Sequence, residues 1–382
     1  LDIVEWVEGD PQVRVLGDHS GGLLTWDCDM INAEIAHGEC YFGTDVYVAV
    51  LDTGLVPHWR DYFYEEGIAT EYATAFLSAA GTEVPNDAWE RDTNSHGTHV
   101  TSTILGYWLY ETSINGVAPR VKVIPVKVIN NGGFGWTSSV VAGILYIAGL
   151  KESGKITKPI VISMSIGSTQ PSLTERAAID YAIKLGLVVV AAAGNEGTEG
   201  MVYPAAWPEV ISVGACGWTK EWTVRDWWLS DVPEDPEILT KEVYITSWSS
   251  RELDGQDLDV VAPGSWVVGP YMPYGIAHPP VRPVPYVPGE YYYVGGTSMA
   301  TPHVSGIVAL MLQADLKDGK QDLTADSIET ILEDTALPIP APSSAWVIDP
   351  FTGEFVEVSW DVDATGAGLV QADAAIKAVM GK

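Results

Sequence analysis

Basic residues are scarce in this chain of 382 residues, in which 20 Lys and Arg stand against 51 Asp and Glu. The formal net charge is −31 at pH 7. Because nucleic-acid binding depends on clustered Lys and Arg that neutralise phosphates, this balance argues against a nucleic-acid partner. It predicts instead a strongly negative surface, which suits high solubility or cation binding.

Cysteine is also rare, since only Cys28, Cys40 and Cys216 are present. The close spacing of Cys28 and Cys40 permits a small disulfide loop of the kind found outside the cell, and we expect this bond rather than two buried thiols. Cys216 lies in the apolar run 210–216. We therefore interpret it as an inert core thiol and not as a nucleophile.

Long apolar runs are missing as well. The run that ends at Ala193 stops short of the roughly 20 residues that a spanning helix needs, so we expect no transmembrane segment. No signal peptide opens the sequence, and its first residue is Leu1, which is typical of a trimmed mature form. A hydrophobic content of 47%, with 15 Trp, predicts a large folded core.

What the sequence does contain is an alternation of strands and helices. Short apolar, β-branched runs predict buried strands at 47–51, 121–129, 159–164, 186–193 and 210–213. Helical patterns lie at roughly 96–107, 138–151, 173–185 and 301–314. Such alternation forms βαβ units, so we expect an α/β fold with a mainly parallel, twisted sheet and helices on both faces. Functional residues should follow the strands directly.

Four segments interrupt this alternation, and we expect them to be surface loops inserted into one domain that spans residues 1–382. They lie near 78–93, 218–244, 269–293 and 338–358. The second is rich in Trp and acidic residues, and the third in Pro and Tyr. The final segment, 366–380, predicts a turn and a short Ala-rich helix.

Two motifs place an acid and a histidine where they could act together. The motif VAVLDTG at 48–54 puts Asp52 at the end of a buried strand, where an acidic side chain is costly unless a partner binds it. On this motif alone, Asp52 could equally be a structural residue that caps a turn. NSHGTHV at 94–100 puts His96 in the first turn of a helix that Ser95 can cap. His99 could suggest a metal pair, but no third ligand is nearby, so we interpret it as a packing residue.

Two more motifs place an amide and a hydroxyl. In VVVAAAGNEG at 188–197, Asn195 follows a strand and a glycine turn. Its amide could donate to a developing oxyanion, or it could be an ordinary turn residue. GGTSMATPHVSG at 295–306 puts Ser298 before a helix that carries Pro302 near its start. A nucleophile there gains from the exposed N–H groups and the dipole of the helix.

In the order Asp52, His96, Ser298, these motifs resemble those of the subtilisin-like serine peptidases, or subtilases, over nearly the whole chain. The resemblance implies a three-layer subtilisin-like fold. It also implies a serine endopeptidase that hydrolyses peptide bonds through an acyl-enzyme, without a catalytic cofactor. Asp52, His96 and Ser298 would form the triad, and Asn195 would be the oxyanion-hole side chain.

The resemblance also implies a substrate site. Matching the family's motifs assigns one wall of the primary specificity pocket to Ser165, Ile166 and Gly167 and the other to Ala192, Ala193 and Gly194. The edge that pairs with an extended substrate would be Gly133, Phe134 and Gly135, by strand addition. Thr297 matches a residue that supplements the oxyanion hole.

Two residues set the expected specificity. Aligning Tyr203-Pro204 with the family's Tyr-Pro places Val202 at the floor of the primary pocket, and Glu196 lies at its rim. We therefore expect cleavage after medium apolar residues such as Leu or Met, with some tolerance of Lys and little cleavage after Asp or Glu.

Further expectations come from the resemblance. The protein should be secreted, and its precursor should carry an N-terminal propeptide that the enzyme removes itself. Structural Ca²⁺ is expected, and Asp61 matches an acidic ligand of a calcium site common in the family. The loop 107–115 lacks the Asn ligands that usually complete this site, and acids on a solvated face are the alternative.

Other functions remain open at this point. An exopeptidase would result if the inserted loops blocked one end of the cleft. A non-catalytic protein could bind a partner through its Trp- and Tyr-rich loops, although the complete triad argues against this. A related serine-carboxyl peptidase would carry Glu in place of His96, which the HGTH string does not fit.

Overall fold

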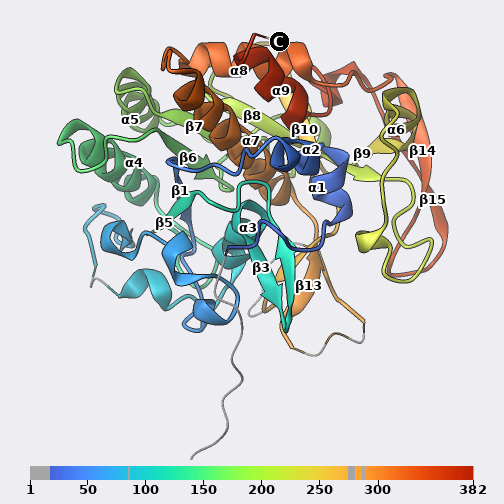
Figure 1. Cartoon of the computed structure of the whole chain (residues 1–382), viewed down its shortest axis with the longest axis horizontal. Helices are drawn as coiled ribbons and strands as arrows, with labels where there is room; N and C mark the ends of the chain where they lie inside the picture. The colour runs from blue at the N-terminus through green and yellow to red at the C-terminus, as the bar shows by residue number, and fades with distance from the viewer. Residues whose placement is uncertain (1–17, 85–86, 274–279, 286, 288, 382) are drawn as a thin grey trace, which may run out of the picture.

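The computed structural model describes residues 18–84, 87–273, 280–285, 287 and 289–381. A central sheet has the strand order β10-β8-β7-β6-β1-β5-β2 with all neighbours parallel, and β9 pairs antiparallel with β8 (Figure 1). Its strands are β1 (Tyr47–Asp52), β2 (Thr74–Ala75), β5 (Lys122–Lys127), β6 (Ile160–Met164), β7 (Val188–Ala192), β8 (Ile211–Trp218), β9 (Val243–Ile245) and β10 (Val260–Pro263). The predicted α/β fold with a mainly parallel sheet is confirmed.

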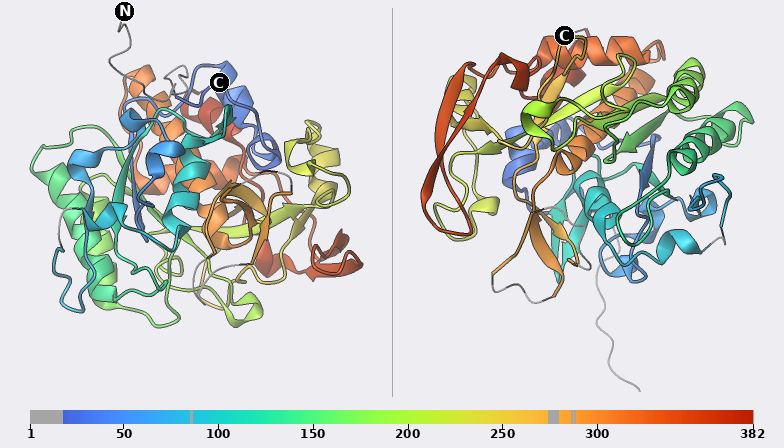
Figure 2. Two further views of the ribbon diagram at one scale, coloured as in Figure 1. Left: turned by 90° about the horizontal axis from the view of Figure 1, so that it is seen from below. Right: turned by 180° about the vertical axis from the view of Figure 1, so that it is seen from behind.

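Both faces of this sheet are buried, which explains why its strands are apolar throughout rather than alternating. In β1, Val48 and Val50 belong to one hydrophobic core, whereas Ala49 and Leu51 belong to the other. The first core is covered by α3 (His96–Leu105) and α7 (Thr297–Asp318), and the second by α4 (Thr137–Glu152) and α5 (Leu173–Lys184) (Figures 1 and 2). The result is the three-layer arrangement expected.

Smaller elements surround these layers. The remaining helices are α1 (Trp26–Met30), α2 (Ala33–Gly38), α6 (Pro236–Glu242), α8 (Ala325–Thr335) and α9 (Ala372–Val379). The remaining strands are β3 (Gly106–Leu109), β4 (Thr112–Asn115), β11 (Val267–Pro270), β12 (Val281–Pro283), β13 (Tyr291–Val294), β14 (Ser343–Ile348) and β15 (Phe355–Trp360). Within the described chain, none of the helices has both the length and the apolar character needed to cross a membrane.

The inserted segments are more ordered than surface loops. Three strands, β11, β13 and β12, form a small antiparallel sheet, and β14 and β15 form a hairpin at the side of the molecule (Figure 1). Burial of aromatic side chains explains the difference, since Trp227 and Trp228 are each 2% exposed and Tyr293 stacks on Trp227 with ring centroids 5.6 Å apart. Aromatic side chains from 218–244 and 269–293 therefore pack into the core, which the sequence did not lead us to expect of these segments.

The predicted disulfide is wrong, because all three cysteines are free thiols. Cys28 is buried in α1 with its Sγ 4.0 Å from the carbonyl oxygen of Asn115, whereas Cys40 is exposed after α2. The two short helices carry these side chains into different environments. Cys216 is buried in β8, and burial raises the pKa of its thiol, in agreement with an inert core residue.

Candidate functional site

Asp52 and His96 meet at the carboxyl end of the central strand β1. Asp52 is the last residue of β1 and His96 the first of α3. The Nδ1 atom of His96 lies 2.8 Å from Oδ1 and 3.0 Å from Oδ2 of Asp52, and the backbone N–H of Thr53 donates to the same Oδ1 at 2.6 Å. The side chain of His96 is 14% exposed and that of Asp52 is 1% exposed, so solvent screens the interaction between them little.

A buried ion pair holds the start of α3 against β1. The Oδ2 atom of Asp92 accepts hydrogen bonds from Thr53 Oγ1 and from the N–H of Ser95, both at 2.7 Å, and its Oδ1 lies 3.3 Å from Lys127 Nζ. The side chain of Ser95 makes no cap, which corrects the sequence prediction; its backbone is left-handed, with φ 70°, and Asp92 binds its N–H instead. Sequence analysis missed this support, although Lys127 within an apolar strand was a visible signal.

Ser298 lies in the first turn of α7, not before the helix as predicted. Pro302 has no N–H to offer the carbonyl four residues earlier, which is that of Ser298. Ser165 Oγ donates to this carbonyl at 2.8 Å instead, so the helix can begin at Thr297. The Ser298 hydroxyl itself donates to the carbonyl of Ser165 at 3.1 Å, and the described hydrogen bonds include none between Ser298 and His96.

Asn195 is exposed after β7, and its amide has a fixed orientation. Its Oδ1 accepts from the N–H of Thr297 at 3.0 Å and from the hydroxyl of Thr297 at 3.1 Å. This leaves the NH₂ group of Asn195 as the donor that faces away from Thr297. Thr297 is fully buried and its hydroxyl hydrogen is used, so it orients Asn195 rather than supplementing an oxyanion hole itself.

A cavity of about 540 Å³ opens beside Asp52 and His96. Its wall includes two of the three predicted substrate segments, namely Gly133, Phe134 and Gly135 and then Ser165, Ile166 and Gly167. The third segment, Ala192, Ala193 and Gly194, does not line it. Ile129, Trp136, Val140 and Glu175 also line the cavity, and sequence analysis did not identify them.

Val202 explains why the third segment is separate. Its N–H donates to the carbonyl of Ala193 at 2.8 Å. A Cβ atom built on Gly194 would lie 2.9 Å from Val202 Cγ1, and one built on Gly167 would collide with Cγ2. The Val202 side chain therefore occupies the space between Gly167 and Gly194, the two predicted pocket walls.

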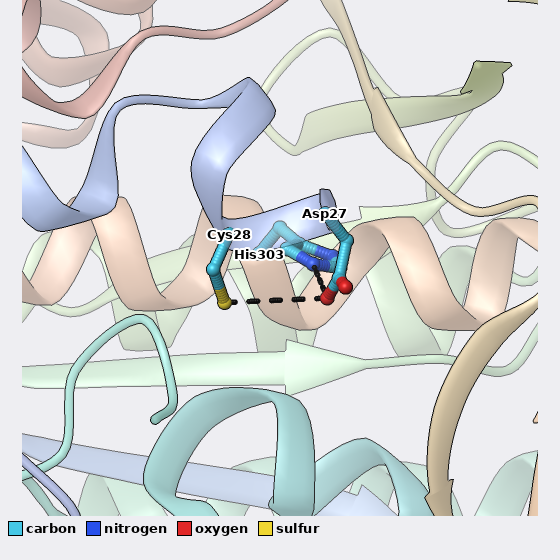
Figure 3. A group of neighbouring side chains, drawn as sticks. All are labelled: Asp27, Cys28 and His303. Atoms are coloured by element: carbon cyan, nitrogen blue, oxygen red, sulfur yellow. Dashed lines mark hydrogen bonds and ion pairs between the residues drawn. The ribbon is translucent and has the colours of Figure 1, made fainter. Parts of the chain in front are cut away.

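Two groups of side chains in the described chain have metal-ligand chemistry, and neither includes Asp61, which is exposed in a short 3₁₀-helix, Trp59–Asp61. The first is the buried set Asp27, Cys28 and His303 (Figure 3). His303 already uses both ring nitrogens, with Nε2 2.9 Å from Asp27 and Nδ1 2.8 Å from the carbonyl of Met299. This arrangement fits a buried hydrogen-bonded pair better than a metal ligand set.

The second group consists of carboxylates alone. Asp259, Glu329 and Glu333 bring their oxygens within 4.8 Å of one another, which is the hard-oxygen chemistry that Ca²⁺ prefers. His99 belongs to neither group. It is fully buried with Nε2 3.2 Å from the carbonyl of Val267, and burial lowers its pKa to about 3, which supports a packing role.

Comparison with known proteins agrees with this geometry. The model of the subtilase family matches residues 43–368. M-protease of Shouchella clausii is 30% identical over 81% of this chain, and the match covers 64% of M-protease, so the chain spans less than two thirds of that relative. Subtilisin Savinase of Lederbergia lenta is 31% identical over 76% of this chain and 84% of its own length. Thermitase of Thermoactinomyces vulgaris is 30% identical over 80% of this chain and 85% of its own length. Because the family model covers most of the chain, including every catalytic candidate, the chain belongs to the subtilase family.

Proposed function

We propose that the protein is a serine endopeptidase that hydrolyses internal peptide bonds of proteins. The observation that carries this proposal is the buried Asp52–His96 hydrogen bond at a cavity whose walls hold the predicted substrate segments. Ser298 at the start of α7 and the oriented amide of Asn195 complete the set of nucleophile, base and oxyanion donor that acyl transfer requires.

In the proposed reaction, each of these residues has one role. Ser298 Oγ turns from the carbonyl of Ser165 and attacks the substrate carbonyl carbon while His96 Nε2 takes its proton. Asp52 keeps the imidazole in the required tautomer and stabilises its charged form. Asn195 Nδ2 and the N–H of Ser298 donate to the oxyanion. His96 then protonates the leaving amine, and a water, activated in the same way, hydrolyses the acyl-enzyme and regenerates Ser298.

Four large aromatic side chains of the inserted segments 218–244 and 269–293 argue against a binding protein that uses these two segments, whereas Trp346, Phe351 and Phe355 of the segment 338–358 are exposed. Trp227, Trp228, Tyr271 and Tyr293 are at most 2% exposed, so they pack inside the protein and offer little surface to a partner. Digestion of casein, followed by mass spectrometry, separates the remaining alternatives. Cleavage at many internal positions is expected, whereas stepwise release of short peptides from one end would establish an exopeptidase.

We also propose that the protein acts outside the cell and is made with an N-terminal propeptide that it removes itself. Its membership of the subtilase family supports this proposal. Because the cysteines are free thiols, a disulfide bond no longer supports an extracellular location. The predicted mature start at Leu1 lies outside the described residues. N-terminal sequencing of the protein secreted from cells that express the precursor tests both points.

Activity should rise with pH at a midpoint above that of an ordinary histidine, about 6.5. Burial is the largest single effect and lowers the pKa of His96, but the charge and hydrogen bond of Asp52 together with the charge of Asp92 outweigh it, so the net pKa is raised. The base must be neutral to accept a proton, and activity is therefore lost as the pH falls through this pKa. A pH profile of kcat/KM measures the midpoint, and a profile that stays flat down to about pH 3 would contradict a histidine base.

Shortening Val202 should widen the preference for the residue before the scissile bond. Val202→Gly empties the space between Gly167 and Gly194. The ratio of kcat/KM for substrates with Phe before the scissile bond to kcat/KM for those with Leu should therefore rise by about tenfold or more, and Val202→Ala should give a ratio between those of the wild type and Val202→Gly. Peptides that differ only at this residue provide the measurement. Val224→Ala, at a valine that is 59% exposed, is the control. An unchanged ratio in Val202→Gly would show that this space is not the primary pocket.

Calcium is proposed as a structural ion, on the resemblance and the acidic composition. Chelation should then lower the melting temperature by several degrees, and Ca²⁺ should restore it, because an ion that binds only the folded state stabilises it by mass action. Calorimetry of metal-stripped protein with and without Ca²⁺ tests this, and identical curves would contradict it. If Glu329→Gln abolishes the response and Asp61→Asn does not, the ion binds at Asp259, Glu329 and Glu333 rather than at Asp61.

A further inference from the structure

The cavity beside the catalytic pair contains a second buried carboxyl group, on Glu175. This residue lies in the first turn of α5, is 6% exposed and lines the same cavity as Asp52 and His96. Within the part of the chain that the structure describes, its carboxylate makes no hydrogen bond or ion pair. Burial raises its pKa to about 7, and no neighbouring cation opposes that shift. Its oxygens are not among the fully enclosed polar atoms that lack a partner, so the carboxylate is open to the cavity.

The end of the helix does not account for this carboxyl group. Ser172 and Glu175 have the spacing of a capping box, in which the acid would bind the N–H of the N-cap residue. Ser172 Oγ does accept from the N–H of Glu175 at 3.3 Å, but the Glu175 side chain does not return the bond. In α8, by contrast, Thr324 and Ser327 make both bonds of the box. The Glu175 carboxylate is therefore free to face the cavity.

Among the residues that the structure describes, none supplies the missing counter-charge. The adjacent cation, Arg176, is paired with Glu209 on the protein surface and lies over the ring of Trp207, 4.5 Å from its centroid. Part of the cavity wall is apolar, and its residues include Ile129, Val140 and Ile166. At the exposed rim, Phe134 and Trp136 are 63% and 60% exposed. Apolar walls suit the stem of a long basic side chain, and aromatic faces attract its cation.

We propose that this cavity binds a Lys or Arg side chain of the substrate and that Glu175 is the specificity-determining residue that pairs with it. The proposal deepens the proposed endopeptidase function and rests on it. An extended substrate that pairs with the edge 133–135 presents alternate side chains to the cavity. The proposed basic residue would therefore occupy one fixed position of the substrate, apart from the scissile bond. The primary pocket beside Val202 is a separate determinant.

Quenched peptides randomised on both sides of the cleaved bond identify that position, and matched peptides with Lys or norleucine there then measure the effect. We expect kcat/KM to favour Lys over norleucine by about tenfold or more in the wild type. Glu175→Gln should abolish the preference, Glu175→Asp should retain part of it, and Glu175→Lys should reverse it towards Glu. Glu71→Gln changes the net charge equally at an exposed site outside the cavity and should leave the ratio unchanged.

The outcomes separate this proposal from the proposed function. Wild-type cleavage without a basic preference, or a preference that survives Glu175→Gln, overturns the role of Glu175 and leaves the peptidase intact. If the wild type cleaves no peptide, the endopeptidase assignment fails. Calorimetric binding of the Lys and norleucine peptides to Ser298→Ala, with and without Glu175→Gln, then decides whether the cavity selects a cation. A melting temperature of Glu175→Gln at least equal to that of the wild type shows that lost selectivity is not unfolding.

Discussion

Replacing Ser298 with alanine is expected to lower kcat for peptide hydrolysis by about 10⁶-fold, because the triad acts as a unit and no other group in it can form the acyl bond. The fold should survive, since the side chain is half-buried and its only described hydrogen bond is to the carbonyl of Ser165. Single-turnover kinetics with a chromogenic peptide, together with a thermal melt, provide the measurement.

Two controls make the Ser298→Ala result specific. Ser153→Ala alters an exposed serine at the end of α4 and should leave kcat unchanged. A fluorophosphonate probe should label the wild type and Ser153→Ala but not Ser298→Ala. Turnover of Ser298→Ala within about tenfold of the wild type would show that another nucleophile acts.

The same Ser298→Ala variant, expressed as a precursor, should keep its propeptide. Normal removal of the propeptide from this variant, with no other protease present, would refute self-processing.

Asp52→Asn should lower kcat by about 10⁴-fold with little change in KM, since the substitution changes the tautomer of the base and not the substrate cavity. The N–H of Thr53 holds Oδ1 at 2.6 Å, and in the variant the amide oxygen would keep this bond. The amide NH₂ would then face Nδ1 of His96 and donate to it. The proton of the neutral ring would move to Nε2, which could no longer accept the proton of Ser298.

The pH profile distinguishes this mechanism from a general structural defect. The Asp52 carboxylate is the main cause that raises the pKa of His96 against burial, so its removal should shift the midpoint of the residual activity to lower pH. Asp45→Asn is a matched control, because Asp45 is exposed and its left-handed backbone, with φ 68°, suits Asn. A variant at Asp52 with both kcat and midpoint unchanged would exclude the proposed role of the carboxylate.

The sequence by itself determined the order of five strands of the central sheet and of the four helices that cover it, and the identities of the catalytic candidates. Both are local properties, since an apolar, β-branched run such as 47–51 has few alternatives to a buried strand. Asp52, His96, Asn195 and Ser298 each stand in a short motif whose neighbours set the local backbone. The family resemblance then joined four local motifs into one site before any distance was known.

The tertiary structure decided what each side chain touches. Thr297 orients Asn195 instead of facing a substrate, and Val202 fills the space between two predicted walls. Cys28 and Cys40 lie in different environments, and Trp218, Trp227 and Trp228 are buried. None of these facts has a local signal, because each depends on packing between segments that are distant in the chain.

Glu175 shows the same division most directly. Its spacing from Ser172 indicates a helix cap, and only the three-dimensional structure reveals that the carboxylate lines a cavity instead. A residue type and its spacing specify which hydrogen bonds are possible, whereas competition among neighbours in the folded protein determines which of them form. The sequence therefore identified the catalytic candidates of this protein, and the packing of its segments determined which residues line the cavity beside them.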